Sequence, residues 1–347
     1  MPSRTFLSSS FRDDVEFVKP SSRKHSAQVT IQHWQLRDLL SCARSRDEFT
    51  YVCGNSVISH NVRTQRSSPL LSDLTFIPTC IAVGSGYLAV GGQRGQVMMK
   101  HIDDDWCAHK SVGGSINNSI SISAHPTGTR MLISNNDQTI KVHSLPGMEQ
   151  ITTIKLPTAI NYGKAQVLES LCKFPDGRKM VAVGDSNQVF LFDVSANGDY
   201  NRIATYTATS DAGFSCAWNQ YSGKFAVANQ DGYISVWDIR HSDKLCKIPT
   251  KQDSQTKGAA RSVKFSPSGS VDLLMFSEHV SYVHLVDSRT FCERQTLRIT
   301  PQHYDQHISG ITFTPDSSRI FVGVEHSVLE YEVDTVLRRS FPAGSLI

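Results

Sequence analysis

The sequence predicts an all-β protein built from seven four-stranded units. Short apolar segments separated by turn residues repeat along the 347-residue chain. Residues at one position of the third strands of five units recur every 45 to 49 residues: His143, Phe192, Trp237, Val286 and Tyr331. A period of about 40–45 residues with four short strands in each unit is typical of β-propeller blades. One repeat-built domain therefore accounts for most of the chain.

The clearest unit is Trp218–Arg240, which reads as three consecutive strands. Lys224–Ala228 is apolar, and Gln230-Asp231-Gly232 is a tight-turn signal because Asp and Gly tolerate positive φ. Tyr233–Ile239 then alternates in the period-2 pattern of a sheet strand. Its Trp237-Asp238 ending resembles the WD dipeptide of WD40 β-propellers, and this resemblance implies a seven-bladed WD40-type ring.

Four other units share a similar turn sequence after their first strand. In this sequence an aromatic residue or His is followed by Pro and polar residues. These turns are His125–Gly128, Phe174–Gly177, Phe265–Gly269 and Phe313–Asp316. Each precedes an apolar strand and then an alternating one, and the alternating strands are Thr139–His143, Gln188–Asp193, Tyr282–Asp287 and Val328–Glu332. In the first unit, we expect strands at Trp34–Ala43, Phe49–Cys53, Val57–Val62 and Ser67–Leu71.

The predicted boundaries are a flexible N-terminal arm at 1–27 and the propeller at 28–347. The last unit has only Arg338–Phe341 as its fourth strand, which is short. A ring must close to avoid an exposed strand edge. We therefore expect an N-terminal segment, either Val15–Val18 or Ala27–Ile31, to pair into the last blade.

Composition and motifs argue against an enzyme. The net charge of +3 is too small to favour nucleic acid or an anionic membrane as the main partner. No apolar run approaches the roughly 20 residues of a membrane span, so we expect an intracellular protein of the cytoplasm or nucleus. GxSxG, HExxH, GxGxxG, P-loop and CxxC motifs are absent, and His303 and His307 lack a third ligand nearby. We expect no catalysis, no metal and no cofactor; an enzyme-type propeller, the alternative, would need convergent acidic or His side chains in the channel.

The stretch Phe225–Arg240 also resembles a sixteen-residue box found in WD40 substrate receptors of cullin-4 ubiquitin ligases. The diagnostic positions are occupied by Asp231, Trp237, Asp238 and Arg240. The resemblance implies a partner-binding site for a ligase adaptor on the bottom face, with the Arg240 guanidinium projecting toward the partner. The alternative is that Asp231 and Asp238 make the turn and strand hydrogen bonds of any well-formed blade.

The turns between second and third strands carry a second set of charges. They contain Asp137, Asp185, Asp231, Glu278 and Glu325, opposed by Arg94. In WD40 rings these turns line the top face beside the channel, so we expect an acidic rim that binds a cationic peptide. The alternative is that Asp is a good turn former, although this explains Glu278 and Glu325 poorly.

Across its length the chain resembles a group of fungal and plant WD-repeat proteins, most specifically in its last unit, His307–Ile347. Some fungal members are similar to substrate receptors of the GID-type ubiquitin ligase. The combined expectation is a non-catalytic protein-interaction scaffold, most specifically a substrate-recruiting or adaptor subunit of a cullin-4 or GID-type ligase. The alternative is a platform in a nuclear, chromatin or RNA-associated complex. Expected partners are other proteins, with neither membrane nor direct nucleic-acid contact.

Overall fold

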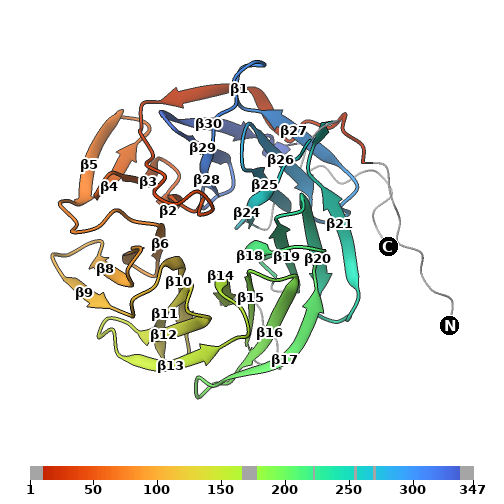
Figure 1. Ribbon diagram of the computed structural model, residues 1–347. Helices are drawn as coiled ribbons and strands as arrows, with labels where there is room; N and C mark the ends of the chain where they lie inside the picture. Colours follow the sequence, from red (N-terminus) through yellow and green to blue (C-terminus); the bar gives the residue numbers. More distant parts are fainter. Residues whose placement is uncertain (1–10, 166–177, 222, 254–255, 269–270, 337–347) are drawn as a thin grey trace, which may run out of the picture.

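The alternating segments of the sequence form antiparallel sheets arranged around an axis in the computed structural model (Figure 1). The structure describes residues 11–165, 178–221, 223–253, 256–268 and 271–336. Within these residues there are seven four-stranded sheets, which confirms the predicted all-β, seven-bladed propeller. The expected turn at Phe174–Gly177 and the expected strand Arg338–Phe341 lie outside the described residues.

The first three blades follow one another along the chain. The first contains β2 (Leu40–Ser45), β3 (Glu48–Cys53), β4 (Ser56–Asn61) and β5 (Arg66–Leu71). The second contains β6 (Cys80–Gly84), β7 (Tyr87–Gly91), β8 (Gln96–His101) and β9 (Cys107–Ser111). The third contains β10 (Asn117–His125), β11 (Gly128–Asn135), β12 (Thr139–Ser144) and β13 (Gln150–Lys155).

The next three blades continue the same order. The fourth contains β14 (Ile160–Ala165), β15 (Arg178–Gly184), β16 (Gln188–Val194) and β17 (Tyr200–Thr207). The fifth contains β18 (Gly213–Trp218), β19 (Lys224–Asn229), β20 (Tyr233–Asp238) and β21 (Lys244–Pro249). A short hairpin of β22 (Gln252–Asp253) and β23 (Thr256–Lys257) precedes the sixth, which contains β24 (Ala260–Phe265), β25 (Leu273–Glu278), β26 (Tyr282–Asp287) and β27 (Arg294–Arg298).

The seventh blade is closed by the N-terminal part of the chain. Its strands are β28 (Ile308–Phe313), β29 (Arg319–Val324) and β30 (Ser327–Val333), and β1 (Val18–His25) pairs with the outer edge of β30. Figure 1 shows β1 at the rim beside β30. An N-terminal segment thus closes the last blade as expected, but it is Val18–His25 and not Val15–Val18 or Ala27–Ile31. The difference arises because Val18 and His25 are buried while all residues between them are exposed, so no apolar alternation marks this strand in the sequence.

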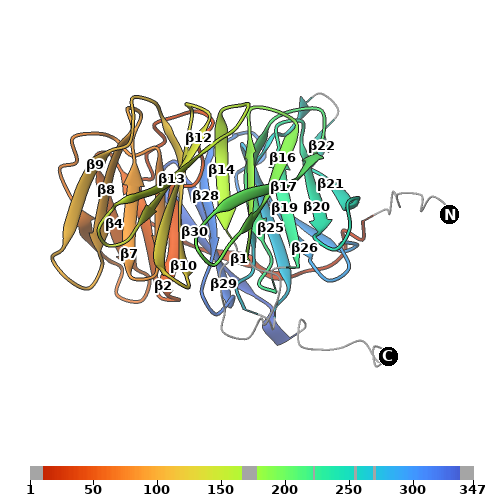
Figure 2. The same cartoon turned by 90° about the horizontal axis from the view of Figure 1, so that it is seen from below.

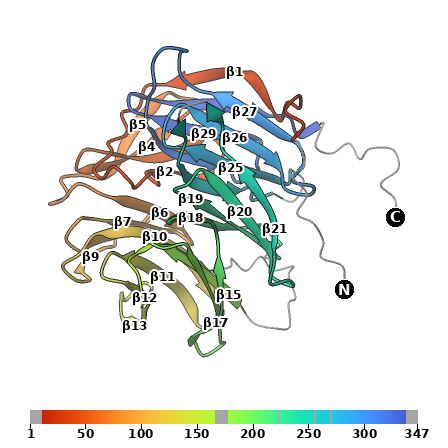
Figure 3. The same cartoon turned by 45° about the vertical axis from the view of Figure 1, so that its right-hand side comes forward.

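Each blade presents its first strand to the centre and its fourth to the rim (Figure 3). First strands of successive blades contact one another all round the ring, including β2 with β28. The strands run between two faces of a disc, seen from the side in Figure 2. One face, called the top face below, carries the turns between second and third strands; Gly232, at φ 76°, forms one of them, as its sequence predicts. The opposite, bottom face carries the turns between first and second strands.

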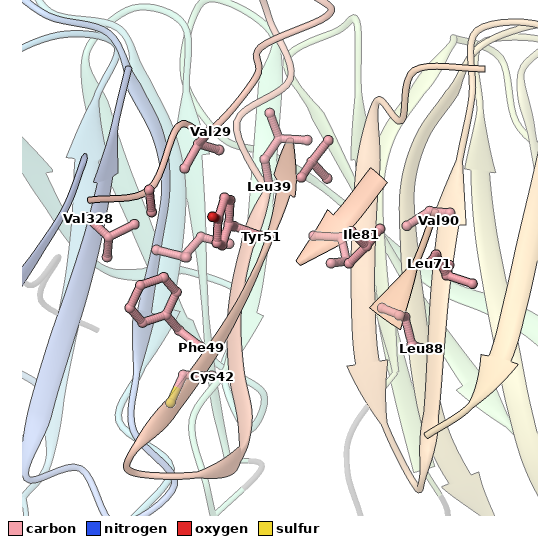
Figure 4. Close-up of a cluster of buried hydrophobic side chains, with 14 of the residues drawn as sticks. Val29, Leu39, Cys42, Phe49, Tyr51, Leu71, Ile81, Leu88, Val90 and Val328 are labelled. Atoms are coloured by element: carbon pink, nitrogen blue, oxygen red, sulfur yellow. The ribbon is translucent and has the colours of Figure 1, made fainter. Parts of the chain in front are cut away.

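The hydrophobic core lies between blades. Phe49 and Tyr51 of the first blade pack between Val328 of the seventh and Ile81 of the second (Figure 4). The other clusters of buried residues each join two neighbouring blades, second to third, third to fourth, fourth to fifth, fifth to sixth and sixth to seventh. A single blade therefore lacks a core of its own, and the ring is the unit that buries apolar surface.

Candidate functional site

A large pocket lies on the top face. It has a volume of about 930 Å³ and is lined by the connection between β1 and β2 and by turns and strand ends of the fifth, sixth and seventh blades. The connection runs from the rim toward the middle of the ring (Figure 1). Its Val29 and Leu39 are buried in the core, so its polar residues are held at fixed positions over the top face. The pocket volume falls within the roughly 300–1,000 Å³ of ordinary ligand sites.

An exposed tryptophan stands at this pocket. Trp34 has 62% of its surface exposed, and its indole stacks on the His33 ring at 6.3 Å between centroids. Arg261 lies beside this tryptophan, with its Cζ 5.5 Å from the Trp34 centroid and 4.0 Å from that of Phe214. Phe214 reaches Arg261 because β18 and β24 are neighbouring first strands. The aromatic rings thus hold the guanidinium through cation–π contacts.

Two arginines of the pocket are buried, Arg37 at 5% exposure and Arg261 at 7%. Nη1 of Arg37 donates to the carbonyl oxygens of His33 (2.9 Å) and Leu36 (3.1 Å), while its Nε has no partner. Nε and Nη1 of Arg261 are also buried without a partner. Burial lowers the pKa of each guanidinium to about 10, and repulsion from Arg37 adds to the effect at Arg261. Both groups remain charged at neutral pH.

Histidines complete the basic lining. His279 follows β25, and His307 and His326 lie in the connections before β28 and after β29. Burial lowers the pKa of His279, and the neighbouring Arg261 charge lowers it further. Its Nδ1 is buried without a hydrogen-bond partner. The acid lining this pocket, among the described residues, is Glu325, whose charge favours the protonated form of Arg37.

The residues predicted for the top face lie at or beside the expected turns, and two of their carboxylates are held by side chains of their own blades. Asp137 accepts from Lys141 Nζ at 2.6 Å, and Asp185 accepts from Asn161 Nδ2 at 2.9 Å. Arg94 is exposed and lies outside the pocket lining, whereas Glu325 is part of it.

Glu278 differs most from the expectation, because it is only 3% exposed. Its carboxylate accepts from the Lys251 backbone N–H at 2.7 Å and lies 2.8 Å from Nε2 of the buried His284. Glu278 thus holds a buried histidine of its own blade and a backbone N–H of the connection before that blade. This structural role explains why a glutamate occurs at this position, which a preference for turns does not. A role for the top-face acids in binding a partner stays a prediction.

The predicted bottom-face residues do not share one face. Asp231 lies at the top end of β20 and accepts from Ser210 N and Oγ at 3.2 and 2.9 Å, whereas Asp238 lies at the other end. Trp237 is 1% exposed and stacks on Phe225 at 5.1 Å, so it is a core residue without surface for a partner. Arg240 is the most accessible of the four, with 77% of its side chain exposed, whereas Asp231 is half-buried.

Asp238 holds Arg240 in place. The Arg240 guanidinium donates from Nε to Oδ1 at 2.9 Å and from Nη2 to Oδ2 at 2.5 Å. These hydrogen bonds lower the pKa of Asp238 to about 2. The sixth blade repeats the arrangement, with Arg289 Nε 3.3 Å from Asp287 Oδ1. The Asp–Arg pair at the end of the third strand therefore also has a structural role within the blade.

A smaller cavity of about 270 Å³ lies inside the channel toward the bottom face. Near it, Asp38 accepts from Lys264 Nζ at 2.9 Å and from the Tyr162 hydroxyl at 3.1 Å, which joins the connection before β2 to the fourth and sixth blades. Within the described ranges no group of three His, Cys, Asp or Glu side chains is arranged to hold a metal ion. No helix in those ranges is long and apolar enough to cross a membrane.

Comparison with known proteins places the chain in a family. It is 30% identical over 342 residues to a Schizosaccharomyces pombe protein described as uncharacterized protein C4G3.03, and the match covers 94% of each chain. The chain belongs to the C4G3.03 family. A family model for an uncharacterised protein domain, DUF2415, matches residues 258–298, which span the sixth blade of this C4G3.03-family chain.

More distant relatives share shorter stretches with this C4G3.03-family protein. Uncharacterized protein YLR149C of Saccharomyces cerevisiae is 34% identical over 91 residues, which is 26% of this chain and 12% of that protein. Pre-mRNA-processing factor 19 of Schizosaccharomyces pombe is 27% identical over 168 residues, covering 47% of this chain and 30% of the relative. A chain in a crystal structure of the mitotic checkpoint complex aligns with a TM-score of 0.73 and 15% identity, over 93% of this chain and 99% of that one. This last likeness shows the WD40-type propeller fold.

The sequence analysis missed Trp34, Arg37, Arg261 and His279. Trp34 and Arg37 were assigned to the first unit, but they belong to the connection that precedes it. Arg261 lies in the strand Ala260–Phe265, which also contains Ser262 and Lys264, so its charge does not stand out in the sequence. Its neighbours in space come from distant blades, so spacing along the chain does not reveal the pocket.

Proposed function

We propose that this chain is a non-catalytic interaction platform that binds a segment of another protein in the top-face pocket. The observation that carries the proposal is the fixed pocket of about 930 Å³ beside the exposed Trp34. Exposed aromatic residues next to a pocket are the usual anchors of protein interfaces, because they contribute large contact area with little conformational freedom to lose.

Affinity purification of the full chain from its native cells, followed by mass spectrometry, tests this proposal. Trp34→Ala removes the exposed anchor, and Ile203→Ala is the matched control, because Ile203 on β17 is 52% exposed and far from the pocket lining. We expect proteins recovered with wild type and Ile203→Ala to be lost with Trp34→Ala. Equal recovery by all three would exclude the pocket as the docking site.

A finer proposal is that the platform recruits substrates to a ubiquitin ligase of the cullin-4 or GID type. The exposed Arg240 on the bottom face supports it, because an adaptor bound there would leave the top-face pocket free for a substrate. In the same purification, Arg240→Ala should lose a ligase component that Arg289→Ala, the equivalent position of the sixth blade, retains. Recovery of RNA-processing or chromatin proteins instead, with no ligase component, would favour the alternative platform, which the distant likeness to Pre-mRNA-processing factor 19 supports.

A further inference from the structure

We propose that the top-face pocket recognises an anionic group, a carboxylate or a phosphate, on the bound protein segment, and that Arg37 and Arg261 hold it. This inference rests on the proposed function, because it names the chemistry of the segment that the pocket binds. Both buried guanidinium groups have N–H donors without acceptors, and neither is paired with a negative charge among the described residues.

The first step is hydrogen bonding. A guanidinium has five N–H donors, and buried donors in native proteins nearly always have acceptors. Arg37 uses Nη1 for two carbonyl oxygens and leaves Nε without a partner. The Arg261 guanidinium has no hydrogen bond or ion pair to any residue that the structure describes, and its Nε and Nη1 are buried. The protein thus pays for burying this guanidinium without supplying an acceptor, which a ligand in the pocket would supply to the group.

The second step is charge. Arg37 and Arg261 are close enough to repel each other, and the surrounding histidines add no negative charge. Glu325 is the acid among the described lining residues; its charge favours the protonated form of Arg37, but no ion pair within 4.0 Å joins it to either arginine. Buried like charges are costly unless a counter-charge is present. An anion between the two guanidinium groups would remove that repulsion.

The third step identifies the ligand class. Planar guanidinium groups match carboxylate and phosphate oxygens in paired hydrogen bonds. The Phe214 and Trp34 rings cover Arg261 and fix its orientation, as an anion-binding fork requires. The volume of about 930 Å³ is much larger than one such group, and the exposed Trp34 offers apolar surface for neighbouring side chains. These features favour an acidic or phosphorylated peptide over a free ion.

The test uses the full-length chain and fluorescent nine-residue peptide pools with a fixed central residue in a degenerate sequence. The central residue is phosphoserine, glutamate, serine or lysine. Comparing the phosphoserine pool with the glutamate pool shows whether the pocket prefers a phosphate or a carboxylate. An oligouridine tests single-stranded nucleic acid, which also combines phosphates with stacking on aromatic residues. We expect one of the two anionic pools to bind at least about tenfold more tightly than the serine and lysine pools.

Two variants assign the effect to the pocket. Arg261→Met removes the charge but keeps a long side chain beside Phe214, and we expect it to abolish the preference for the anionic pool. Arg94→Gln is the control, because it removes one exposed arginine from the same face outside the pocket lining, and it should keep the preference. A binding role also predicts that Arg261→Met has a Tm equal to or above that of wild type, since a buried unpaired charge is removed. A purely structural arginine would give a lower Tm.

The outcomes separate this inference from the proposed function. Equal binding of anionic and neutral pools that Trp34→Ala abolishes would overturn the anion-binding role and keep the pocket as a protein site. A preference that survives in Arg261→Met, or no binding of either anionic pool up to about 1 mM, would also overturn it. Tighter binding of oligouridine than of every peptide pool, lost in Arg261→Met, would replace the peptide by nucleic acid. Unchanged partner recovery with Trp34→Ala in the purification described above would reject the proposed function itself.

Discussion

Asp238 shows how one residue can serve the blade and also position a surface group. Its side chain is almost completely covered, yet it accepts two hydrogen bonds from the exposed Arg240 guanidinium and one from the Arg240 backbone N–H. Those bonds favour the ionised carboxylate and lower its pKa to about 2. A surface arginine held in this way loses less freedom when it meets a partner than a free one would.

The Asp238 pKa leads to a prediction about stability and pH. Because the folded pKa of about 2 lies below the ordinary value of 3.8, the contribution of Asp238 is present above about pH 4 and is lost as pH falls toward 2. Arg240→Ala should remove most of this contribution, so the variant should be slightly less stable than wild type at pH 7, since the arginine is exposed, and the gap should close toward pH 2. Urea midpoints of wild type and variant between pH 2 and pH 7 measure the effect. A gap between the two proteins that stays constant down to about pH 2 would contradict the assignment.

At the scale of elements, β1 supplies the fourth strand of the seventh blade and so closes the ring. Arg23, Lys24 and His25 pair with Glu330, Leu329 and Val328 of β30. His25 is fully buried, lies 2.7 Å from Glu330 Oε2 through Nε2, and contacts the Phe49 ring of the first blade at 5.7 Å between centroids. The strand therefore ties the seventh blade to the first by backbone and side-chain contacts.

Deleting residues 1–26 should open the ring, because it exposes the edge of β30 and leaves Glu330 without its histidine. We expect a lower Tm and concentration-dependent association through the free edge. Deleting only residues 1–10 is the control, since β1 stays intact. Calorimetry and size-exclusion chromatography compare the two proteins. A monomeric 1–26 deletion with wild-type Tm would mean that β1 is dispensable.

The sequence allowed much of the element scale to be predicted, because blade strands follow from local alternation. β26 has the predicted bounds Tyr282–Asp287, and β12, β16 and β30 differ from prediction by one or two residues. The closing strand was harder, since its exposed middle residues carry no apolar alternation and its partner lies about 300 residues away in sequence. The pocket was harder still. Trp34, Arg37 and Arg261 meet only after the ring has closed.

At the scale of the whole molecule, every described hydrophobic cluster is shared between blades. Linear repeat arrays unfold from their ends, but a closed ring has no end at which fraying can begin. The channel ion pair of Asp38 with Lys264, and the Tyr162 hydroxyl bonded to the same carboxylate, cross the ring as well. We therefore expect the blades to unfold together rather than one after another.

Trp237→Ala tests this cooperativity from one buried position. The indole packs against Phe225 and Tyr206, in the cluster that joins the fourth and fifth blades, so its removal leaves a cavity there and should cost about 3–5 kcal/mol. Trp34→Ala, at an exposed tryptophan, should leave stability nearly unchanged. If the ring is cooperative, Trp237→Ala lowers the free energy of unfolding measured by circular dichroism. It then lowers the free energy of hydrogen exchange in the first, second and seventh blades by the same amount as in the fifth. If only the fourth and fifth blades lost protection in Trp237→Ala, the ring would be a chain of independent neighbours despite its closure.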